Sequence, residues 1–202
     1  MGLIVGAVGL VRLERHMEST YLPLTASTWP SFETVMGCDQ GGNGGCWCTW
    51  WRLARGEWER QGRAGRKSYF RHIVENGQPT GIIGLRDGSP YGWCAVAPVQ
   101  DYPVIGRSPV ARPSLRDGDW FISCFFVEAR YRRSGALLDL LTHAIDFAQS
   151  HGALAIEACP RDSPAGSGIS DLFVGKTSVF LGLGFVEVHR QRHDRPLLRL
   201  EL

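Results

Sequence analysis

Hydrophobic and polar positions follow two periods along this chain, and together they predict a mixed α/β fold. Apolar runs bounded by turn residues are typical of strands. Such runs lie at residues 20–25, 80–85, 91–97, 119–127, 153–159, 185–191 and 196–202. Apolar residues that recur every three or four positions predict helices. These lie at residues 28–37, 65–76, 134–151 and 175–184.

The order of these elements predicts how the sheet is connected. Asp87 and Gly88 are a hairpin signal between two predicted strands. The run "DWFISCFFV" at 119–127 is apolar at successive positions, which is typical of a central strand covered on both faces. The helix that follows it ends at Gly152 and leads into another apolar strand. This strand–helix–strand unit predicts a crossover in the middle of a mixed sheet.

Composition and charge narrow the class of protein. Apolar residues make up 44% and charged residues 21% of the chain, which is ordinary for a soluble globular domain. The formal net charge of +2 gives no strong field, so neither nucleic acid nor a membrane is expected as a partner. The apolar run at 2–11 is too short to span a bilayer and has no basic leader. The six cysteines lie in apolar or aromatic surroundings, as reduced thiols do, and we expect a cytoplasmic protein.

The segment "RRSG", Arg132–Gly135, lies between the central strand and the long helix. The first amides of a helix have no partner within the helix and, with the helix dipole, favour an anion such as a phosphate. Gly135 lets the backbone approach that anion closely, and Arg132 and Arg133 add positive charge. This turn could therefore hold a pyrophosphate without a metal, or it could be an ordinary solvated turn.

From about Thr20 to Leu202 the chain resembles the GNAT acetyltransferase superfamily. The acyl-CoA motif of that family is an arginine or glutamine, two residues, a glycine, one residue, and a glycine or alanine, placed at the start of a helix. Arg132, Gly135 and Leu137 fall on these positions, and Leu137 departs from the small residue of the motif. The segment "GLGFVEVHR" at 182–190 is similar to the late helix-to-strand junction of the family.

The resemblance implies a fold and an activity. The fold is a mixed, mostly antiparallel central sheet with a splayed strand pair, flanked by helices. The activity is transfer of an acetyl group from acetyl-CoA to a primary amine, which makes the protein an N-acetyltransferase. The domain of this type should span residues 20–202, with residues 1–19 as an N-terminal extension, and Met17 could be the true start. The apolar segment at 3–11 could also pack at a homodimer interface.

The resemblance also implies roles for individual residues. The pantetheine arm of the co-substrate should insert like an extra strand beside the central strand, where backbone groups of Phe126, Val127 and Glu128 would pair with it. The amide of Val127 would face the thioester carbonyl and stabilise the oxyanion as the amine attacks. The residues expected to hold the pyrophosphate are Arg132, Arg133, Ser134, Gly135, Ala136 and Leu137.

The attacking amine must also lose a proton, and Glu157 is the leading candidate for the base. Glu157 interrupts the apolar strand "ALAIEAC", and a carboxylate near a cleft is a typical acid–base group. It could instead form an ion pair at the strand end, and Glu128 is the second choice. Where the family commonly has a tyrosine that protonates the departing thiolate, this chain has Phe180, which has no proton to donate. Phe180 and Ser178 would line the co-substrate site, with Ser178 as an alternative acid.

Three further sequence patterns have simpler explanations than the functional motifs that they resemble. Cys46 and Cys48 are separated by one residue rather than the two typical of zinc sites, so no metal is expected. The segment "VGKTS" at 174–178 lacks the glycine and the strand that a phosphate-binding P-loop needs. The aromatic patch at 46–51 could form a wall for the acceptor substrate, or it could pack the early helices on the sheet.

Three classes of function follow. The first is an N-acetyltransferase that acts on an unidentified small-molecule amine. The second is a weakly catalytic CoA-binding or sensory module of the same fold, because Leu137 and Phe180 depart from the family pattern. The third is a partner-binding protein that uses its tryptophan-rich face. Four acidic residues in predicted loops could receive a cationic amine such as an aminoglycoside-like antibiotic; these are Asp101, Asp117, Asp119 and Asp171.

Overall fold

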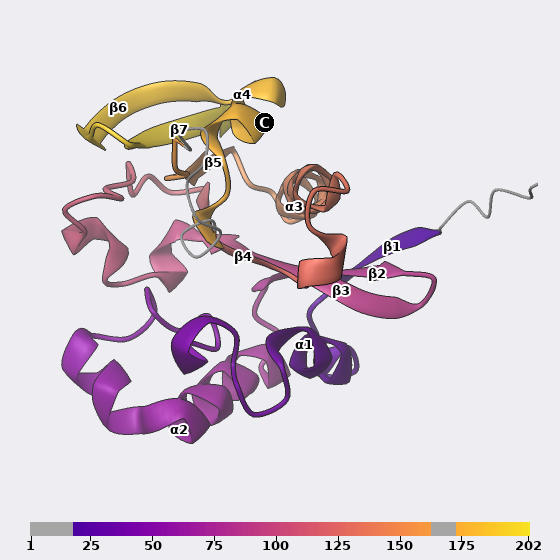
Figure 1. The fold of residues 1–202 in the computed structure, drawn as a ribbon. Helices are drawn as coiled ribbons and strands as arrows, with labels where there is room; N and C mark the ends of the chain where they lie inside the picture. The colour runs from indigo at the N-terminus through magenta and orange to yellow at the C-terminus, as the bar shows by residue number, and fades with distance from the viewer. Residues whose placement is uncertain (1–17, 163–172) are drawn as a thin grey trace, which may run out of the picture.

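A seven-stranded sheet forms the centre of the computed structural model, which describes residues 18–162 and 173–202 (Figure 1). The strands are β1 (Ser19–Pro23), β2 (Gly81–Arg86), β3 (Ser89–Pro98), β4 (Asp119–Val127), β5 (Ala155–Ala158), β6 (Val186–Arg192) and β7 (Arg195–Glu201). The helices are α1 (Trp29–Met36), α2 (Arg55–Glu75), α3 (Ala136–Ser150) and α4 (Thr177–Gly182). Most of the expected N-terminal extension, residues 1–17, lies outside the described residues.

The strands lie in the order β1-β2-β3-β4-β5-β7-β6, which puts β4 in the middle of the sheet as predicted. Of the six strand pairs in the described part of the chain, five are antiparallel, and only β4 and β5, which α3 connects, are parallel. The expected mixed, mostly antiparallel sheet is confirmed. The hairpin between β2 and β3 turns at Asp87 and Gly88, whose φ angles of 49° and 74° are both left-handed, as a two-residue type I′ turn requires.

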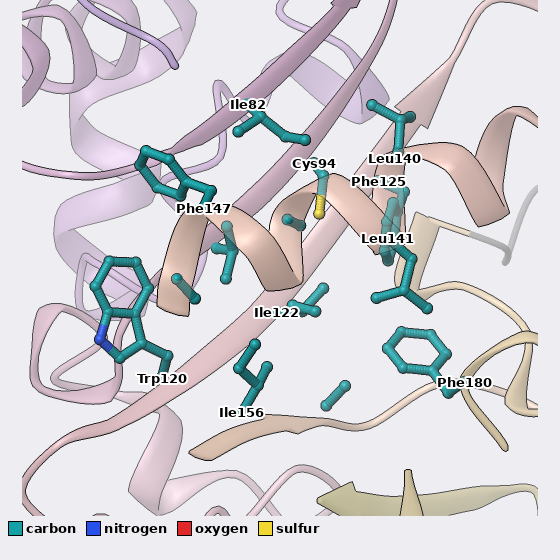
Figure 2. Close-up of a cluster of buried hydrophobic side chains, with 14 of the residues drawn as sticks. Ile82, Cys94, Trp120, Ile122, Phe125, Leu140, Leu141, Phe147, Ile156 and Phe180 are labelled. Carbon is teal, nitrogen blue, oxygen red and sulfur yellow. The ribbon is translucent and has the colours of Figure 1, made fainter. Parts of the chain in front are cut away.

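Helices cover both faces of the sheet (Figure 1). α3 packs on one face, and α1 and α2 pack on the other. The period of two within the strands separates the two sides: Ile82 and Cys94 contact the α3 side, whereas Ile83 and Trp93 contact the α1 and α2 side. Figure 2 shows the cluster on the α3 side, where Leu140 and other apolar residues of the helix lie over the strands. Each fully buried side chain of this size contributes roughly 1.5–3 kcal/mol relative to exposure.

The segment between β3 and β4 covers the rest of the sheet face on which α1 and α2 pack. It was predicted to be a loop, and it contains only short turns of 3₁₀ helix at Val99–Asp101 and Ile105–Arg107. Tyr102 and Ile105 are buried against Phe121 of β4 and neighbouring apolar residues. The segment is therefore anchored to the sheet by its own side chains.

The helix predicted at 65–76 begins ten residues earlier than expected, at Arg55. Its first half is polar and has no apolar period, which is why the sequence pattern missed it. Gly62 interrupts the helical backbone with a φ of 58°. Arg66 joins the two halves, since it donates a hydrogen bond to the Trp58 carbonyl at 2.8 Å and its guanidinium lies 3.7 Å from the centre of the Trp58 ring.

Arg199 of β7 joins three strands through a group of buried charges. Its guanidinium donates to Asp119 of β4 at 2.8 and 2.9 Å and to Glu157 of β5 at 3.0 Å. The second carboxylate oxygen of Glu157 accepts the backbone N–H of Ser114 at 2.7 Å. Burial opposes ionisation of Asp119, but hydrogen bonds from Arg199 and Ser114 hold the pKa of that carboxyl below its usual range. This group fastens β5 and β7 to the first half of β4.

We predict that Arg199→Met lowers the free energy of unfolding at pH 7 by about 3–5 kcal/mol, because Asp119 and Glu157 are left buried without their cation. A carboxyl group with a lowered pKa stabilises the folded state above its unfolded pKa of about 3.9, and this stabilisation is lost as the pH falls through the folded pKa. The difference in the free energy of unfolding between the parent and Arg199→Met should therefore shrink below about pH 4. Urea unfolding at neutral and acidic pH measures both effects.

Arg192→Met is the matched control for this experiment. Arg192 lies on β6, is largely exposed and pairs with Asp194 at 3.4 Å. A surface pair of this kind contributes at most about 1 kcal/mol. A loss for Arg199→Met no greater than that for Arg192→Met would contradict the stabilising role of the buried group.

Candidate active site

The central strand β4 has an open edge along its second half. β5 pairs with β4 from Asp119 to Ile122, and within the described residues no strand pairs with that side of Ser123–Val127. A β-bulge lies at the same place, because Ala95 pairs with Cys124 and Val96 with Ile122, which leaves Ser123 as the extra residue. A bulge bends its strand and increases the local twist. β4 and β5 therefore separate, and this is the splayed pair that the resemblance implied.

Two backbone amides of the open edge are directed into the gap. The N–H of Glu128 donates to the carbonyl of Tyr91 at 2.9 Å, so the alternation of an antiparallel pair directs the backbone groups of Glu128 and Phe126 toward β3. The same alternation directs those of Phe125 and Val127 into the gap. The backbone groups of Phe126 and Glu128, which were expected to pair with an extended ligand, therefore point toward β3, and such pairing at the open edge stays a prediction.

The turn from Arg132 to Gly135 connects this edge to α3. Arg132 donates from Nε to the carbonyl of Val127 at 3.0 Å, which ties the turn to the open edge. Arg133 and Gly135 both have left-handed backbone, with φ angles of 65° and 85°. A Cβ on Gly135 would meet no atom within 4 Å, so glycine is needed there for its conformation and not for space. All four residues of the turn are exposed and accessible to a ligand.

The start of α3 offers further amides. The first hydrogen bond of the helix runs from the N–H of Asp139 to the carbonyl of Gly135 at 3.1 Å, so the amides of Ala136, Leu137 and Leu138 precede the helical ladder. These amides and the helix dipole favour an anion at this end. Ala136 is buried, and the half-buried side chain of Leu137 packs against the core under α3. The larger residue at position 137 is thus accommodated by the core.

Arg86 lies beneath this turn, and the sequence analysis missed its role. The side chain is 7% exposed and lies over the rings of Tyr91 and Tyr131, at 5.0 and 5.4 Å from the ring centres. It donates to the Ser134 hydroxyl at 3.2 Å and pairs with Asp139 at 3.6 Å. Ser134 in turn donates to the carbonyl of Tyr131 at 2.7 Å. Arg86 therefore holds the Arg132–Gly135 turn against the start of α3, and adds positive charge under both.

A signal for Arg86 was present in the strand pattern. Ile82 and Arg86 are four residues apart, so the period of two places both on the α3 side of β2. An arginine at an inward position needs partners inside the fold. The residue was taken only as part of the hairpin sequence "RDGSP".

Both candidate bases have an arginine partner. Glu157 is 1% exposed and accepts hydrogen bonds from Arg199 and Ser114, as described above. It lies opposite Phe121, one pair before the end of the β4–β5 ladder and therefore next to the gap. Glu128 pairs with Arg130 at 2.8 Å. The ion pair that was the alternative for Glu157 is present, and a catalytic role for either residue stays a prediction.

Phe180 and Ser178 differ in their surroundings. Phe180 is fully buried, and its ring lies edge-on to Phe125 at 6.0 Å and to Phe185 at 5.1 Å. It supports the open edge from within the core, through the side chain of Phe125. Ser178 is exposed on α4.

The early aromatic patch divides into two parts. Trp47 is fully buried in the core under α1, as the packing explanation predicted. Trp50 and Trp51 instead line a cavity of about 340 Å³. Cys48 is buried with Trp47 and accepts a hydrogen bond from Nε1 of Trp93 at 3.0 Å. A hydrogen bond from the Cys124 thiol holds the pKa of Cys48 below its usual range, although burial opposes this.

Most of the acidic loop residues already have other partners. Asp101 pairs with Arg52 at 3.6 Å, and Asp117 accepts a hydrogen bond from Gln100 at 3.4 Å. Asp119 is held by Arg199. Asp171 lies outside the described residues. The three described members of this group are therefore already engaged within the fold.

Comparison with protein families assigns the chain to a class. The model of the acetyltransferase (GNAT) family matches residues 47–165, which is more than half of the chain. The protein therefore belongs to this family. It is an acyltransferase with acetyl-CoA as its co-substrate, which confirms both predictions. A comparison with curated proteins finds no match.

Solved structures of this class share the fold at low sequence identity. An N-acetyltransferase from Staphylococcus aureus Mu50 is 14% identical, with a TM-score of 0.54 over 91% of this chain and 98% of that chain. The PaiA N-acetyltransferase from Thermoplasma acidophilum, solved in complex with coenzyme A, is 9% identical, with a TM-score of 0.53 over 92% and 100%. The ribosomal-protein-alanine N-acetyltransferase from Brucella melitensis is 16% identical, with a TM-score of 0.52 over 91% and 99%. No helix among residues 18–162 and 173–202 is long and apolar enough to cross a membrane.

We predict that Arg86→Met weakens CoA binding about tenfold, or ~1.4 kcal/mol, because the turn loses its support and a buried positive charge. The methionine keeps an apolar stem between the two tyrosine rings. Isothermal titration calorimetry with CoA measures the dissociation constant.

Asp139→Asn tests whether the weaker CoA binding of Arg86→Met comes from the lost positive charge or from a loosened turn. It removes the carboxylate partner of Arg86 and also a negative charge beside the expected phosphates. CoA should therefore bind this variant as tightly as the parent, or more tightly. Equal weakening in both variants would show that Arg86 acts only through the stability of the turn.

Proposed function

We propose that the protein transfers the acetyl group of acetyl-CoA to a primary amine of a small molecule. The observation that carries this proposal is the open edge of β4, with the backbone of Phe125 and Val127 directed into the gap. An extended amide chain could pair there as an added strand. The turn from Arg132 to Gly135 and the first amides of α3 follow directly, where the pyrophosphate would bind.

The reaction makes one bond and breaks one. The amine nitrogen bonds to the thioester carbonyl carbon, the carbon–sulfur bond breaks, and the sulfur leaves with the electron pair as a thiolate. The Val127 amide would donate to the carbonyl oxygen as negative charge develops on it. A thiol has a pKa of about 8.5, so its thiolate can leave without a dedicated acid. The phenylalanine at position 180 is therefore compatible with turnover.

We also propose that Glu157 receives the proton that the amine loses. It lies one pair from the gap and is oriented by Arg199 and the Ser114 amide. A base that a third group holds in place is the usual arrangement in enzymes. Glu128 or a chain of water molecules is the alternative route.

The six free cysteines support the cytoplasmic location that the sequence predicted.

The first test is CoA-dependent stabilisation. CoA at a hundred times its dissociation constant should stabilise the fold by about 2.7 kcal/mol, measured as a rise in melting temperature. Gly135→Ala should abolish most of this rise, because alanine is disfavoured at a φ of 85° and the amides of the turn would shift.

Gly152→Ala is the matched control at the other end of α3. Gly152 has a φ of 79° and equally open surroundings, so both substitutions should cost about 1–2 kcal/mol in stability. Only Gly135→Ala should impair the response to CoA. If the parent shows no response to millimolar CoA, CoA binding itself is refuted. If CoA binds but no amine in a broad panel releases thiol, the sensory module is the better explanation.

The second test concerns the base. Glu157→Gln should lower kcat by roughly 10²–10⁴-fold while CoA affinity stays unchanged. Activity should partly return at high pH, where more of the amine is already neutral. The rate of thiol release from pH 6 to 9 provides the measurement.

Asp119→Asn separates catalysis from stability. Asp119 shares Arg199 with Glu157, so either change should lower the melting temperature. Only Glu157→Gln should lower the rate at a temperature where both variants are folded. A parental rate in Glu157→Gln would move the base to Glu128 or to water.

A further inference from the structure

A cavity of about 340 Å³ lies between the loop before α2, the start of α2 and the segment that follows β3, and none of its lining residues belongs to the expected co-substrate turn. Three tryptophans form much of its wall. Trp50 lies edge-to-face with Trp58, with 5.2 Å between ring centres, and with Trp51 at 6.4 Å. Arg66 covers one face of Trp58 at 3.7 Å, which fixes that ring in place. Such a wall suits a flat, apolar group about the size of one aromatic ring.

Positive charge lies at the same cavity. Arg107 and Arg55 both line it and are exposed. Arg55 is paired with Glu59 at 3.0 Å. The side chain of Arg107 has no hydrogen-bond or ion-pair partner among the described residues. A guanidinium without a partner beside an apolar wall is arranged to receive a carboxylate in two parallel hydrogen bonds.

A chain of side-chain contacts leads from the cavity to the bulge of β4. The loop before α2 and the segment that follows β3 join where the N–H of Val104 donates to the carbonyl of Trp51 at 3.4 Å. Behind this contact, Arg52 lies over the ring of Tyr102 at 4.7 Å. Tyr102 accepts a hydrogen bond from the Ser123 hydroxyl, on the bulge of β4, at 3.2 Å. The cavity therefore lies on the same face of the sheet as the bulge, with the side chains of Arg52 and Tyr102 between them.

We propose that this cavity binds the acceptor of the acetyl group, and that the acceptor is a small aromatic amine bearing a carboxylate. The aromatic body would lie against Trp50 and Trp58, and the carboxylate would pair with Arg107. This inference rests on the proposed function and names its substrate class. It replaces the cationic acceptor considered from the sequence, since Asp101 and Asp119 are occupied by Arg52 and Arg199.

Phenylalanine and 2-phenylethylamine test the proposal, because they differ only in the carboxylate. In the parent, kcat/KM for thiol release should be about tenfold higher with phenylalanine, the size expected for a charge-assisted hydrogen bond. Arg107→Gln should remove that preference by lowering the value for phenylalanine alone. Trp50→Leu should lower the value for both amines, since both lose the same aromatic contact.

Arg112→Gln is the matched control. It makes the same charge change in the same loop, but Arg112 does not line the cavity. It should leave kcat/KM unchanged with both phenylalanine and 2-phenylethylamine. A higher kcat/KM with an aminoglycoside than with phenylalanine, or an unchanged preference in Arg107→Gln, would overturn the proposal.

A binding measurement keeps this test separate from the test of catalysis. N-acetylphenylalanine, the expected product, should quench the tryptophan fluorescence of the parent and bind Arg107→Gln about tenfold more weakly. If CoA fails to bind but this ligand still binds through Arg107, the proposed function fails and the cavity remains a binding site. If CoA binds and other amines are acetylated while this ligand does not bind, the acceptor class is wrong and the proposed function stands.

Discussion

The separation of β4 from β5 after Ile122 is the constraint on which the rest of the site depends. A strand in the middle of a sheet normally has both backbone edges paired, and unpaired buried amides are costly. β4 keeps an open edge because the bulge at Ser123 bends it away while β5 ends at Ala158. The order of the site follows from this edge: amides directed into the gap, then the turn, then the start of α3. Without the bulge, β5 could continue the ladder and occupy the place of a ligand.

An edge of this kind must be held open by its surroundings. Below it, Arg199 fastens β5 and β7 to the first half of β4, so the two strands are fixed up to the point where they part. On one face the ring of Phe180 supports Phe125, and on the other Tyr102 contacts Ser123. At its far end, Arg132 binds the carbonyl of Val127. Packing and hydrogen bonds thus hold the gap at these four places, which reduces the cost of ordering it when a ligand binds.

The sequence pattern predicted the helices and strands better than the side-chain contacts that they make. β4 was predicted over the same residues that it occupies, because its apolar run is long and bounded by turns. The first half of α2 was missed because its residues carry no apolar period, and the contact of Arg66 with Trp58 joins residues eight positions apart across the break at Gly62. The "RRSG" turn could be found from a motif. The strand pattern could place Arg86 on the inner side of β2 but could not identify its partners Ser134 and Asp139, which lie far away in the chain. The arginine partner of Glu157 was likewise hidden, because it comes from a strand that pairs with β5 only in the folded sheet.

The distribution of charge explains how a nearly neutral protein can have arginines without acidic partners at particular places. Most acidic groups inside the fold are used by structural arginines: Asp101 by Arg52, Asp139 by Arg86, and Asp119 by Arg199. These pairs cancel in the net charge of +2. Arg107 and Arg133 have no acidic partner among the described residues, and they lie at the cavity and at the turn. The proposed carboxylate site and the proposed pyrophosphate site therefore each contain an arginine without an acidic partner, and net charge alone could not have revealed either.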